Sequence, residues 1–438
     1  MAKRAKRKKS RKGSIIIGAI AVILVLVIIT AVVLYVVKPE IYHKYLGVGE
    51  HTWNADGICA VCGLDGNDGT EQGAKDSEFS VHIIDLGKNA GDSIYIRASG
   101  NDILIDAGAT GASAPLICSY LDKYVTDGKL EYVIATHADS DHISAFTGSS
   151  GSGSSRTGVL YNYKVGTLIR FDNITEKKSG NVQKPNTEIG RFFAALDYLE
   201  SNGTSVYTAG QCYYEQEGAK RQYFLDDGKT LSMNILYNYY YYNVSDDENN
   251  HSVVTLFTKT TSNGSFNWLF TGDLEKDGES RLVDYYSDSS NSKSEYDVLP
   301  DVDFYKAGHH GSGTSSSEKL LNVIKPEYVG ISCCAGAPEY TAVNDNTFPY
   351  TAVFGNLLKH TRKIYCTSVA KNLPSLGSDG KFDGRSYDFE PCNGTVITYF
   401  NSMRTENGVY ENVKVWCTDS QESVIDTDWY KKYRESAV

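Results

Sequence analysis

The amino-acid sequence predicts an α/β or α+β protein, built of sheets covered by helices and preceded by one transmembrane helix. The length of 438 residues suggests one large domain or two modest ones. With 22% charged and 12% aromatic residues, the composition is that of a globular protein. Strand-like segments come first after residue 78, and strand-like and helix-like segments then alternate, which favours layered sheets and helices. One long apolar stretch without any charge, at residues 14–37, stands apart from this pattern.

The N-terminal region predicts a membrane anchor. Residues 1–12 hold eight Lys or Arg residues and no acid, and the 24-residue apolar stretch 14–37 can cross about 30 Å of hydrocarbon. A cleaved signal peptide is the alternative, but its apolar core is usually roughly 7–15 residues long and a small-residue cleavage site follows it. We therefore expect a single-pass protein of the cell membrane, with residues 1–13 as a basic cytoplasmic arm and the rest outside the cell.

The exported body is predicted to be acidic. Eight of the 43 Lys and Arg residues lie in the basic arm, so the remaining 35 face 54 Asp and Glu residues. This balance argues against a body that binds nucleic acid through a general positive field, although a local basic groove is compatible with it. The basic clusters that could build such a groove, Lys177–Lys178 and Lys359–Lys363, are sparse.

Residues 38–77 are predicted to form a juxtamembrane linker with a Cys/His motif. His51 is followed by Cys59 and Cys62, and two cysteines at this spacing can share a zinc ion with a histidine. The pattern HTW…CxxCG resembles a short motif of exported proteins of Gram-positive bacteria, but one further cysteine of that motif is absent. A redox or structural disulfide is therefore as good an interpretation. The chain has nine cysteines, an odd number whose scatter does not indicate a disulfide scaffold.

The remaining elements follow from apolar runs and turn signals. Strands are expected first at 79–85, 93–97, 102–105 and 131–135, with helices at 115–125 and 186–201. Further strands are expected near 230–237, 252–258, 267–271, 302–306, 327–332, 363–367 and 394–400, and further helices near 316–323 and 350–358. The Gly/Ser-rich residues 148–158 favour a flexible loop. The tyrosine run at 237–242 favours an alternating strand with one exposed tyrosine face over a sugar-stacking surface.

The most informative segment for chemistry directly follows the strand-like residues EYVIA. His137, Asp139, Asp141 and His142 lie within six residues of one another, and imidazole nitrogen and carboxylate oxygen are ligands for zinc, manganese or iron. A solvated acidic loop accounts for two aspartates by chance, but it would rarely also contain both histidines. We expect these four side chains to converge on a metal.

Two more metal-capable groups occur where later strand-like segments end. Asp273 follows the apolar residues WLFTG, and the pair His309 and His310 follows DFYKAG. Loops at strand ends are where a rigid sheet presents reactive groups, so we expect all of these side chains at one site.

The motif order HxDxDH, TGD and HHGS resembles the metallo-β-lactamase superfamily. More narrowly, it is similar to the soluble domain of the ComEC/Rec2 competence proteins. The resemblance runs from about residue 79 to residue 400 and includes VHIIDLGKNAGDSIYIRASGNDILIDAG at 81–108 and NNHSVV at 249–254. It implies an αββα sandwich with a two-metal site, here a hydrolase domain at 78–420 followed by a C-terminal tail at 421–438.

The resemblance also implies a set of ligands. His137 and Asp139 would hold the first metal, and Asp273 would bridge both metals. Asp141 and His142 would hold the second metal together with one of the two adjacent histidines, of which we favour His309, leaving His310 to support the site or contact a phosphate. Two zinc ions are expected, and manganese is also compatible because Asp139 stands where most of the superfamily has histidine.

The third superfamily histidine has no clear counterpart. His251 lies close to the expected position, but alignment on Ser252 places Asn249 there. The competence pattern also has His-Pro where this chain has Phe348–Pro349, so one polar contact to substrate is replaced.

The chemistry that such a site implies is hydrolysis by a metal-bound hydroxide, with a phosphodiester as the expected substrate. Asp141 would also orient or shuttle a proton, and Ser312 would donate to a phosphate oxygen. DNA and a cell-surface phosphodiester are both open as substrates. The alternative is a catalytically degenerate fold that binds a cell-wall or signalling partner, against which stands the cost of burying so many uncompensated carboxylates and imidazoles without a metal.

Overall fold

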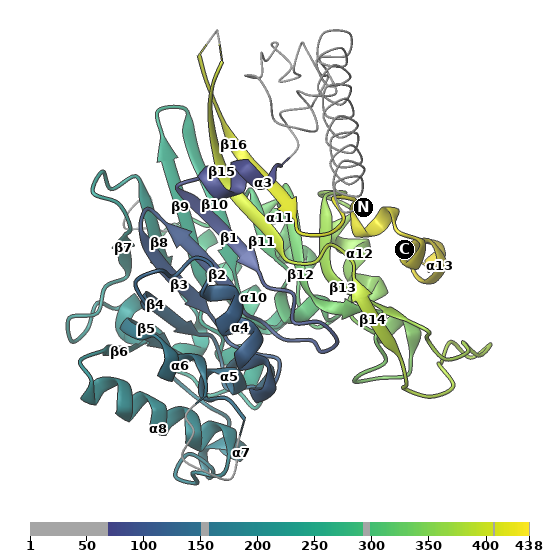
Figure 1. The fold of residues 1–438 in the computed structure, drawn as a ribbon, viewed down its shortest axis with the longest axis horizontal. Coiled ribbons are helices and arrows are strands. Elements are labelled where there is room, and N and C mark those ends of the chain that lie inside the picture. The colour runs from purple at the N-terminus through teal and green to yellow at the C-terminus, as the bar shows by residue number, and fades with distance from the viewer. Residues whose placement is uncertain (1–68, 150–156, 292–297, 406–407, 438) are drawn as a thin grey trace, which may run out of the picture. The chain divides into compact units, whose positions relative to one another are not determined.

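The computed structural model describes residues 69–149, 157–291, 298–405 and 408–437 (Figure 1). The larger of two compact units comprises Thr70–Ser402 and Glu411–Val438 and contains the whole candidate site. The predicted basic arm, the predicted anchor at 14–37 and the Cys59/Cys62 motif lie outside the described residues. Within the described ranges, no helix is both long enough and apolar enough to cross a membrane.

The first of two sheets has eight strands in the order β16-β15-β1-β2-β3-β4-β5-β6. Its strands β15, β1, β2 and β3 pair antiparallel, whereas β3, β4, β5 and β6 pair parallel. The parallel half therefore places the carboxyl ends of β3 and β4 at the same edge. The bounds are β1 Phe79–Ile83, β2 Ile94–Ala98, β3 Asn101–Ile105, β4 Lys129–Ala135, β5 Lys164–Arg170, β6 Ser205–Thr208, β15 Val396–Thr405 and β16 Gly408–Cys417.

The second sheet also has eight strands, in the order β14-β13-β12-β11-β10-β9-β8-β7. Here β7 to β10 pair antiparallel, β10 to β13 pair parallel, and β14 closes the sheet antiparallel. The bounds are β7 Gln222–Phe224, β8 Leu231–Ile235, β9 Thr255–Thr261, β10 Gly264–Phe270, β11 Phe304–Lys306, β12 Tyr328–Ala335, β13 Ile364–Lys371 and β14 Asp388–Pro391.

Helices cover the outer faces of the two sheets, which is the mixed α/β, metallo-β-lactamase-like architecture expected from the sequence (Figure 1). The first sheet carries α4 Ala114–Leu121, α5 Ser140–Thr147, α6 Val159–Asn162 and α8 Glu188–Ser201, and the second carries α10 Lys276–Ser287, α11 Glu318–Ile324 and α12 Thr351–Leu357. The other α-helices are α3 Glu71–Asp76, α7 Glu176–Ser179, α9 Ala209–Tyr213 and α13 Asp428–Tyr433.

The core shows the two-residue periodicity of strands that are buried on both faces. On β10, Trp268 and Phe270 belong to the large cluster between the sheets, whereas Leu269 between them packs in the cluster under α10, α11 and α12. The Trp268 ring meets Phe79 of the opposite sheet edge to face, with centroids 4.5 Å apart. Its indole N–H donates to Thr398 Oγ1 at 3.1 Å, so the largest core side chain is also hydrogen-bonded across the sandwich.

The tyrosine run at 237–242 does not form the expected strand. Tyr239–Tyr241 form a 3-10 helix, and both Tyr240 and Tyr241 are buried. Asn238 explains the turn, because its Oδ1 accepts the Tyr240 N–H at 3.0 Å while its amide nitrogen donates to the Asn250 and Ser252 carbonyls, each at 2.9 Å. Local side-chain capping therefore overrides the β propensity of tyrosine here.

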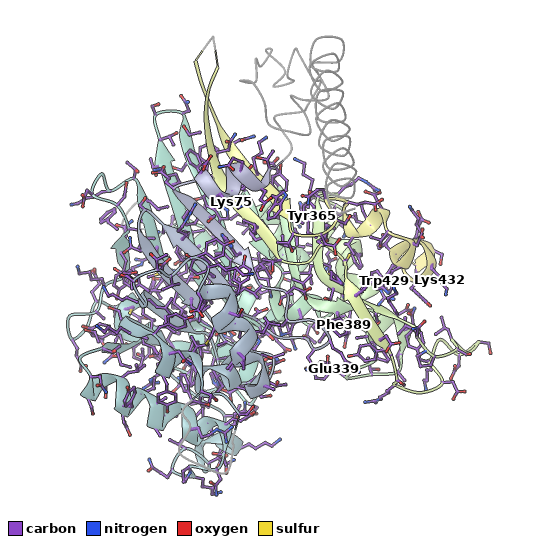
Figure 2. All side chains as sticks on the ribbon, in the orientation of Figure 1. Lys75, Glu339, Tyr365, Phe389, Trp429 and Lys432 are labelled. Atoms are coloured by element: carbon purple, nitrogen blue, oxygen red, sulfur yellow. The ribbon has the colours of Figure 1, made fainter. Side chains whose placement is uncertain are left out.

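The segment 421–438, predicted as a tail, is instead packed onto the domain over its described residues. Trp429 of α13 is labelled in Figure 2. Together with the adjacent Tyr430 it is buried in the cluster that also holds Phe354 of α12. The guanidinium of Arg434 is buried as well, and it donates to the carbonyls of Pro349 and Thr347, each at 3.1 Å. Ile425, Trp429 and Tyr433 follow one another at intervals of four residues, so the sequence carried a short helical signal that the prediction of a tail did not use.

Candidate metal centre

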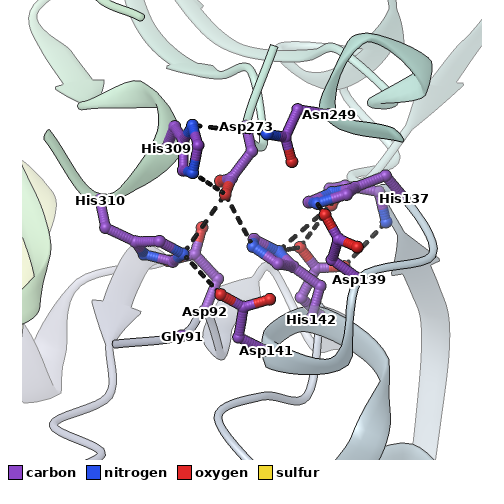
Figure 3. A network of polar contacts seen from close by, with 12 residues as sticks. Gly91, Asp92, His137, Asp139, Asp141, His142, Asn249, Asp273, His309 and His310 are labelled. Carbon is purple, nitrogen blue, oxygen red and sulfur yellow. Dashed lines mark hydrogen bonds and ion pairs between the residues drawn. The ribbon is translucent and has the colours of Figure 1, made fainter. Parts of the chain in front are cut away.

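The candidate centre lies where β4, β10 and β11 end (Figure 3). His137 and Asp139 lie on the loop after β4, and Asp139 is the residue at which α5 begins. Asp141 and His142 therefore occupy the first turn of α5 and point back toward the loop. The loop after β10 adds Asp273, and the residues after β11 add the histidine pair.

Gly272 brings Asp273 to the loop after β4. It has a φ of +52°, and a Cβ added there would lie 2.9 Å from Thr136 Cβ and 3.0 Å from Ser252 Oγ. Only glycine tolerates both the backbone conformation and this close approach. The Asp273 N–H donates to Ser252 Oγ at 3.1 Å, which holds this residue against the segment before β9.

Four side chains converge within the spacing of ligands around one ion. His142 Nε2 lies 3.1 Å and His310 Nε2 lies 3.4 Å from Asp273 Oδ2, and His310 Nε2 lies 3.6 Å from Asp141 Oδ2. Tetrahedral ligands with bonds of roughly 2.0–2.1 Å lie about 3.3 Å apart. The described residues thus form overlapping groups able to hold a metal, with His137, His142 and Asp273 in one and Asp141, His142 and His310 in another.

Unpartnered buried atoms support this interpretation. The Nε2 atoms of His137, His142 and His310 and the Oδ1 atom of Asp273 are buried and have no hydrogen-bond partner among the described residues. Their short contacts to carboxylates therefore lack hydrogen-bond geometry. Leaving such a group unpaired costs about 1–3 kcal/mol, and a divalent cation would satisfy the atoms of the group that holds it. The residues present therefore fit a metal ion.

Outer contacts hold two of the imidazoles in the orientation that a metal requires. His142 Nδ1 lies 2.7 Å from Asp106 Oδ2, and Asp106 also accepts the backbone N–H of Thr136 at 2.7 Å and its hydroxyl at 2.6 Å. His310 Nδ1 donates to the Ser332 carbonyl at 2.9 Å. A hydrogen bond at Nδ1 leaves the Nε2 lone pair directed into the centre, as in metal-ligating histidines generally.

The buried carboxylate and imidazole groups of the centre shift one another's pKa values. Burial by itself raises the pKa of Asp273, but the neighbouring His142 and His310 outweigh it and hold that pKa well below its usual range. Burial likewise disfavours charge on His142 and His310, yet Asp273 raises the pKa of both imidazoles. A metal ion would compete with these imidazole protons for the same positions.

The structure favours His310 over His309 as the ligand on this side of the centre. His310 is fully buried with Nε2 in the cluster, whereas His309 is 22% exposed and its Nε2 is 3.9 Å from Asp273 Oδ2. His309 Nδ1 instead lies 3.2 Å from Thr314 Oγ1 and 3.4 Å from Glu275 Oε1. The sequence predicts His309 as the ligand, and the structure corrects this prediction to His310. Both residues have left-handed backbone, with φ of +46° and +52°, which no periodicity argument anticipates.

At the position expected for the first ion, beside His137 and Asp139, a lysine contacts one of the expected ligands. His137 Nε2 lies 3.5 Å from Asp139 Oδ2, and the other oxygen of Asp139 accepts a hydrogen bond from Lys178. Asn249 lies beside the centre (Figure 3). His251 does not, because its Nε2 accepts the backbone N–H of Ser245 at 2.9 Å. Of the two alternatives left open by the sequence, Asn249 therefore occupies the place beside the cluster.

Ser312 does not join the cluster. Its side chain is 3% exposed, and its Oγ lies 2.9 Å from Thr314 Oγ1. The role as a phosphate donor expected from the sequence would require this hydroxyl to turn away from Thr314, so the structure gives it no direct support.

Three buried residues at the site were not singled out from the sequence. Asp92 Oδ2 pairs with Lys306 Nζ at 3.0 Å, both side chains are 1% exposed, and Asp92 Oδ1 lies 3.4 Å from His310 Nδ1. Asp106, the partner of His142, is the third. A signal was available for both aspartates, since Asp106 directly follows the β3 strand and Asp92 follows a glycine, as Asp273 does.

An aromatic wall borders the centre. The Phe348 ring lies 5.8 Å from the His309 ring and 5.9 Å from the His310 ring, and Tyr340 and Tyr350 flank it at 5.4 and 5.7 Å. Tyr340 is 55% exposed. Phe348, which stands where the competence pattern has a histidine, thus contributes a flat apolar face beside His309 and His310.

Comparison with known proteins agrees with this geometry. Residues 86–149 match the sequence model of the metallo-beta-lactamase superfamily, and the chain therefore carries a domain of that superfamily. It is 27% identical over 276 residues to ComE operon protein 3 of Bacillus subtilis (strain 168), covering 58% of this chain and 28% of that protein. It is 37% identical over 114 residues to competence protein ComA of Neisseria gonorrhoeae, covering 26% and 14%.

These matches are consistent with the competence-protein subgroup, and the chain spans less than a third of the length of either relative. Among solved structures, a subclass B3 metallo-beta-lactamase of Bradyrhizobium japonicum is 14% identical over 44% of this chain and 59% of that chain. The TM-score of that superposition is 0.25, which adds nothing to the assignment.

Proposed function

We propose that this protein is a metal-dependent phosphodiesterase. The observation that carries the proposal is the convergence of Asp141, His142, Asp273 and His310 in overlapping groups. Buried atoms of His142, Asp273 and His310 have no hydrogen-bond partner among the described residues. An ion held by these residues would supply a Lewis acid and lower the pKa of a bound water. The superfamily domain and the competence-protein relatives support hydrolysis as the reaction class.

The side chains around that centre divide the remaining tasks. Asp141 is the more accessible of the two carboxylates, at 20% exposure against 2% for Asp273, so it is placed to orient the nucleophile and accept its proton. Burial opposes its charge, but His310 and His142 lower the pKa of Asp141, so it is ionised at neutral pH. His309, half turned to solvent with Glu275 behind its Nδ1, is placed to contact a phosphate oxygen or the leaving group.

The substrate proposed is an anionic diester with a flat or cationic group beside the phosphate. Lys178 and His309 at the edge of the centre suit a phosphate, and the Tyr340–Phe348–Tyr350 wall suits a base or a quaternary ammonium group. DNA and a cell-surface phosphodiester both meet this description. We further propose, from the sequence alone, that residues 14–37 anchor the protein in the cell membrane with the hydrolase outside.

The test is metal content and turnover of the purified full chain. Zinc or manganese is supplied, and hydrolysis of bis-p-nitrophenyl phosphate, p-nitrophenyl phosphorylcholine and single-stranded DNA is measured. We expect the Asp141→Ala, His142→Ala double variant to lose turnover by at least roughly 100-fold. The matched control is His360→Ala, Asp379→Ala, which removes the same residue types outside the cluster and should retain turnover.

The substrate that turns over fastest separates a nuclease from a surface esterase. Bound metal without turnover of any substrate would favour a binding module of the same fold. Unchanged turnover in the double variant, or no bound metal under any condition, would overturn the proposed centre.

A further inference from the structure

Lys178 is a fixed part of the centre rather than a surface lysine that happens to lie near it. Its Nζ donates to Asp139 Oδ1 and, at 2.6 Å, to the Ala138 carbonyl. The side chain is 26% exposed, whereas its neighbour Lys177 is in the exposed class and carries no described contact. An ammonium group that donates to both a carboxylate and a carbonyl is held at one point.

A buried carboxylate, that of Glu248, holds the start of α7, the short helix that carries Lys178. The backbone N–H and the hydroxyl of Thr175, where α7 begins, both donate to Glu248 Oε2 at 2.9 Å. Glu248 starts the 3-10 segment Glu248–His251, which also carries Asn249. The helix that carries Lys178 and the segment that carries Asn249 are therefore connected through one buried hydrogen-bonded pair, Thr175 and Glu248.

The first-ion position is poor in ligands as a result. His137, His142 and Asp273 form one group there, but His142 and Asp273 also belong to the groups that contain His310. The ligands that this position does not share are the His137 imidazole and the Asp139 carboxylate, one oxygen of which already accepts from the ammonium group. The amide nitrogen of Asn249 faces Glu275 Oε1 at 3.4 Å and His309 Nδ1 at 3.5 Å. A carboxylate that is neutralised by a lysine binds a divalent ion weakly, and the fixed positive charge repels such an ion.

We propose that the Lys178 ammonium group takes the place of the first ion, so that the centre holds a single divalent ion among Asp141, His142, Asp273 and His310. The inference rests on the proposed metal centre and deepens it. It predicts a mononuclear enzyme in which a lysine supplies the positive charge beside Asp139.

The test counts Mn²⁺ ions on the full chain. Manganese has little affinity for thiolates, so Cys59 and Cys62 contribute nothing to the count. Stoichiometry is measured by equilibrium dialysis with elemental mass spectrometry, and electron paramagnetic resonance distinguishes an isolated ion from two ions that are magnetically coupled. The variants are Lys178→Met and, in case that side chain disturbs folding, Lys178→Gln, which keeps a donor for the Ala138 carbonyl. Lys178→Arg retains the charge, and Lys177→Met is the matched control.

We expect one isolated Mn²⁺ per chain in the wild type, in Lys178→Arg and in Lys177→Met. We expect a second, coupled ion in Lys178→Met and Lys178→Gln, bound at least tenfold more tightly than any second ion in the wild type. Two tightly bound ions in the wild type would overturn the inference and leave the hydrolase proposal standing. One ion in every variant would show that Lys178 does not exclude the second. No Mn²⁺ or Zn²⁺ in any variant would overturn the proposed centre itself.

Discussion

Asp106 is the residue whose replacement tests most directly how the centre is organised. Its carboxylate is fully buried and accepts from three donors: His142 Nδ1 at 2.7 Å, the Thr136 N–H at 2.7 Å and the Thr136 hydroxyl at 2.6 Å. In Asp106→Asn, only one oxygen remains for these donors, and the new amide N–H₂ faces one of them. Two effects of different size follow, one on metal affinity and one on folding.

The metal affinity of Asp106→Asn should fall by about 10–100-fold, because the orientation of the His142 ring is no longer held. This loss corresponds to roughly 1.4–2.7 kcal/mol. The unfolding free energy of the metal-free variant should fall by about 1–3 kcal/mol, since one buried donor loses its acceptor. Chelator competition measures the first quantity, and urea unfolding of the metal-free protein measures the second.

The matched control is Asp102→Asn on the same strand. Asp102 lies near the opposite end of β3 and accepts the Tyr95 hydroxyl at 2.5 Å, so its replacement also removes a carboxylate hydrogen bond but none at the centre. Metal affinity should be unchanged in this control. Wild-type metal affinity in Asp106→Asn would refute the reasoning, and if its unfolding free energy fell at the same time, Asp106 would be a purely structural residue.

Two further predictions concern the histidine pair and a buried glutamate. His310→Ala should abolish metal binding, whereas His309→Ala should keep the metal and lose turnover; the reverse pattern in metal content would contradict the assignment. Burial raises the pKa of Glu279 to about 7 from 4.5, against the N–H groups of Ser316 and Ser317 that donate to it. The folded protein thus holds this proton where the unfolded chain does not, so the unfolding free energy should fall by up to about 3 kcal/mol between pH 4.5 and 7. Urea unfolding across that range should show a flatter profile for Glu279→Gln, and parallel profiles would speak against it.

Much of the candidate site was readable from the sequence because metal ligands at strand ends leave a local signature. His137, Asp139, Asp141 and His142 follow one apolar strand within six residues, and Asp273 follows another. Loops at strand ends are where a sheet presents reactive groups, so a shared site could be expected from the sequence. That β4 and β10, which belong to different sheets, end beside each other follows only from the packing of the two sheets. The mixed α/β architecture was predictable from local patterns, since buried strands and amphipathic helices each carry their own period.

Other features depended on contacts between segments far apart in the chain. Which of two adjacent histidines ligates is decided by two consecutive left-handed residues, His309 and His310, and by a carbonyl of β12. The tyrosine run forms a 3-10 helix with buried rings because the amide nitrogen of Asn238 donates to carbonyls twelve and fourteen residues further along the chain. Neither outcome has a periodic signal.

Ligand types and strand periodicity are local properties, so the fold class and the candidate ligands Asp141, His142 and Asp273 could be predicted from residues that are close together in the chain. The tertiary structure alone decided that His310 rather than His309 points inward and that Asp106 orients His142. It also placed Lys178 on Asp139, 39 residues away in the chain. These choices were beyond the sequence because they follow from burial and from long-range hydrogen bonds, which exist only once the two sheets have packed.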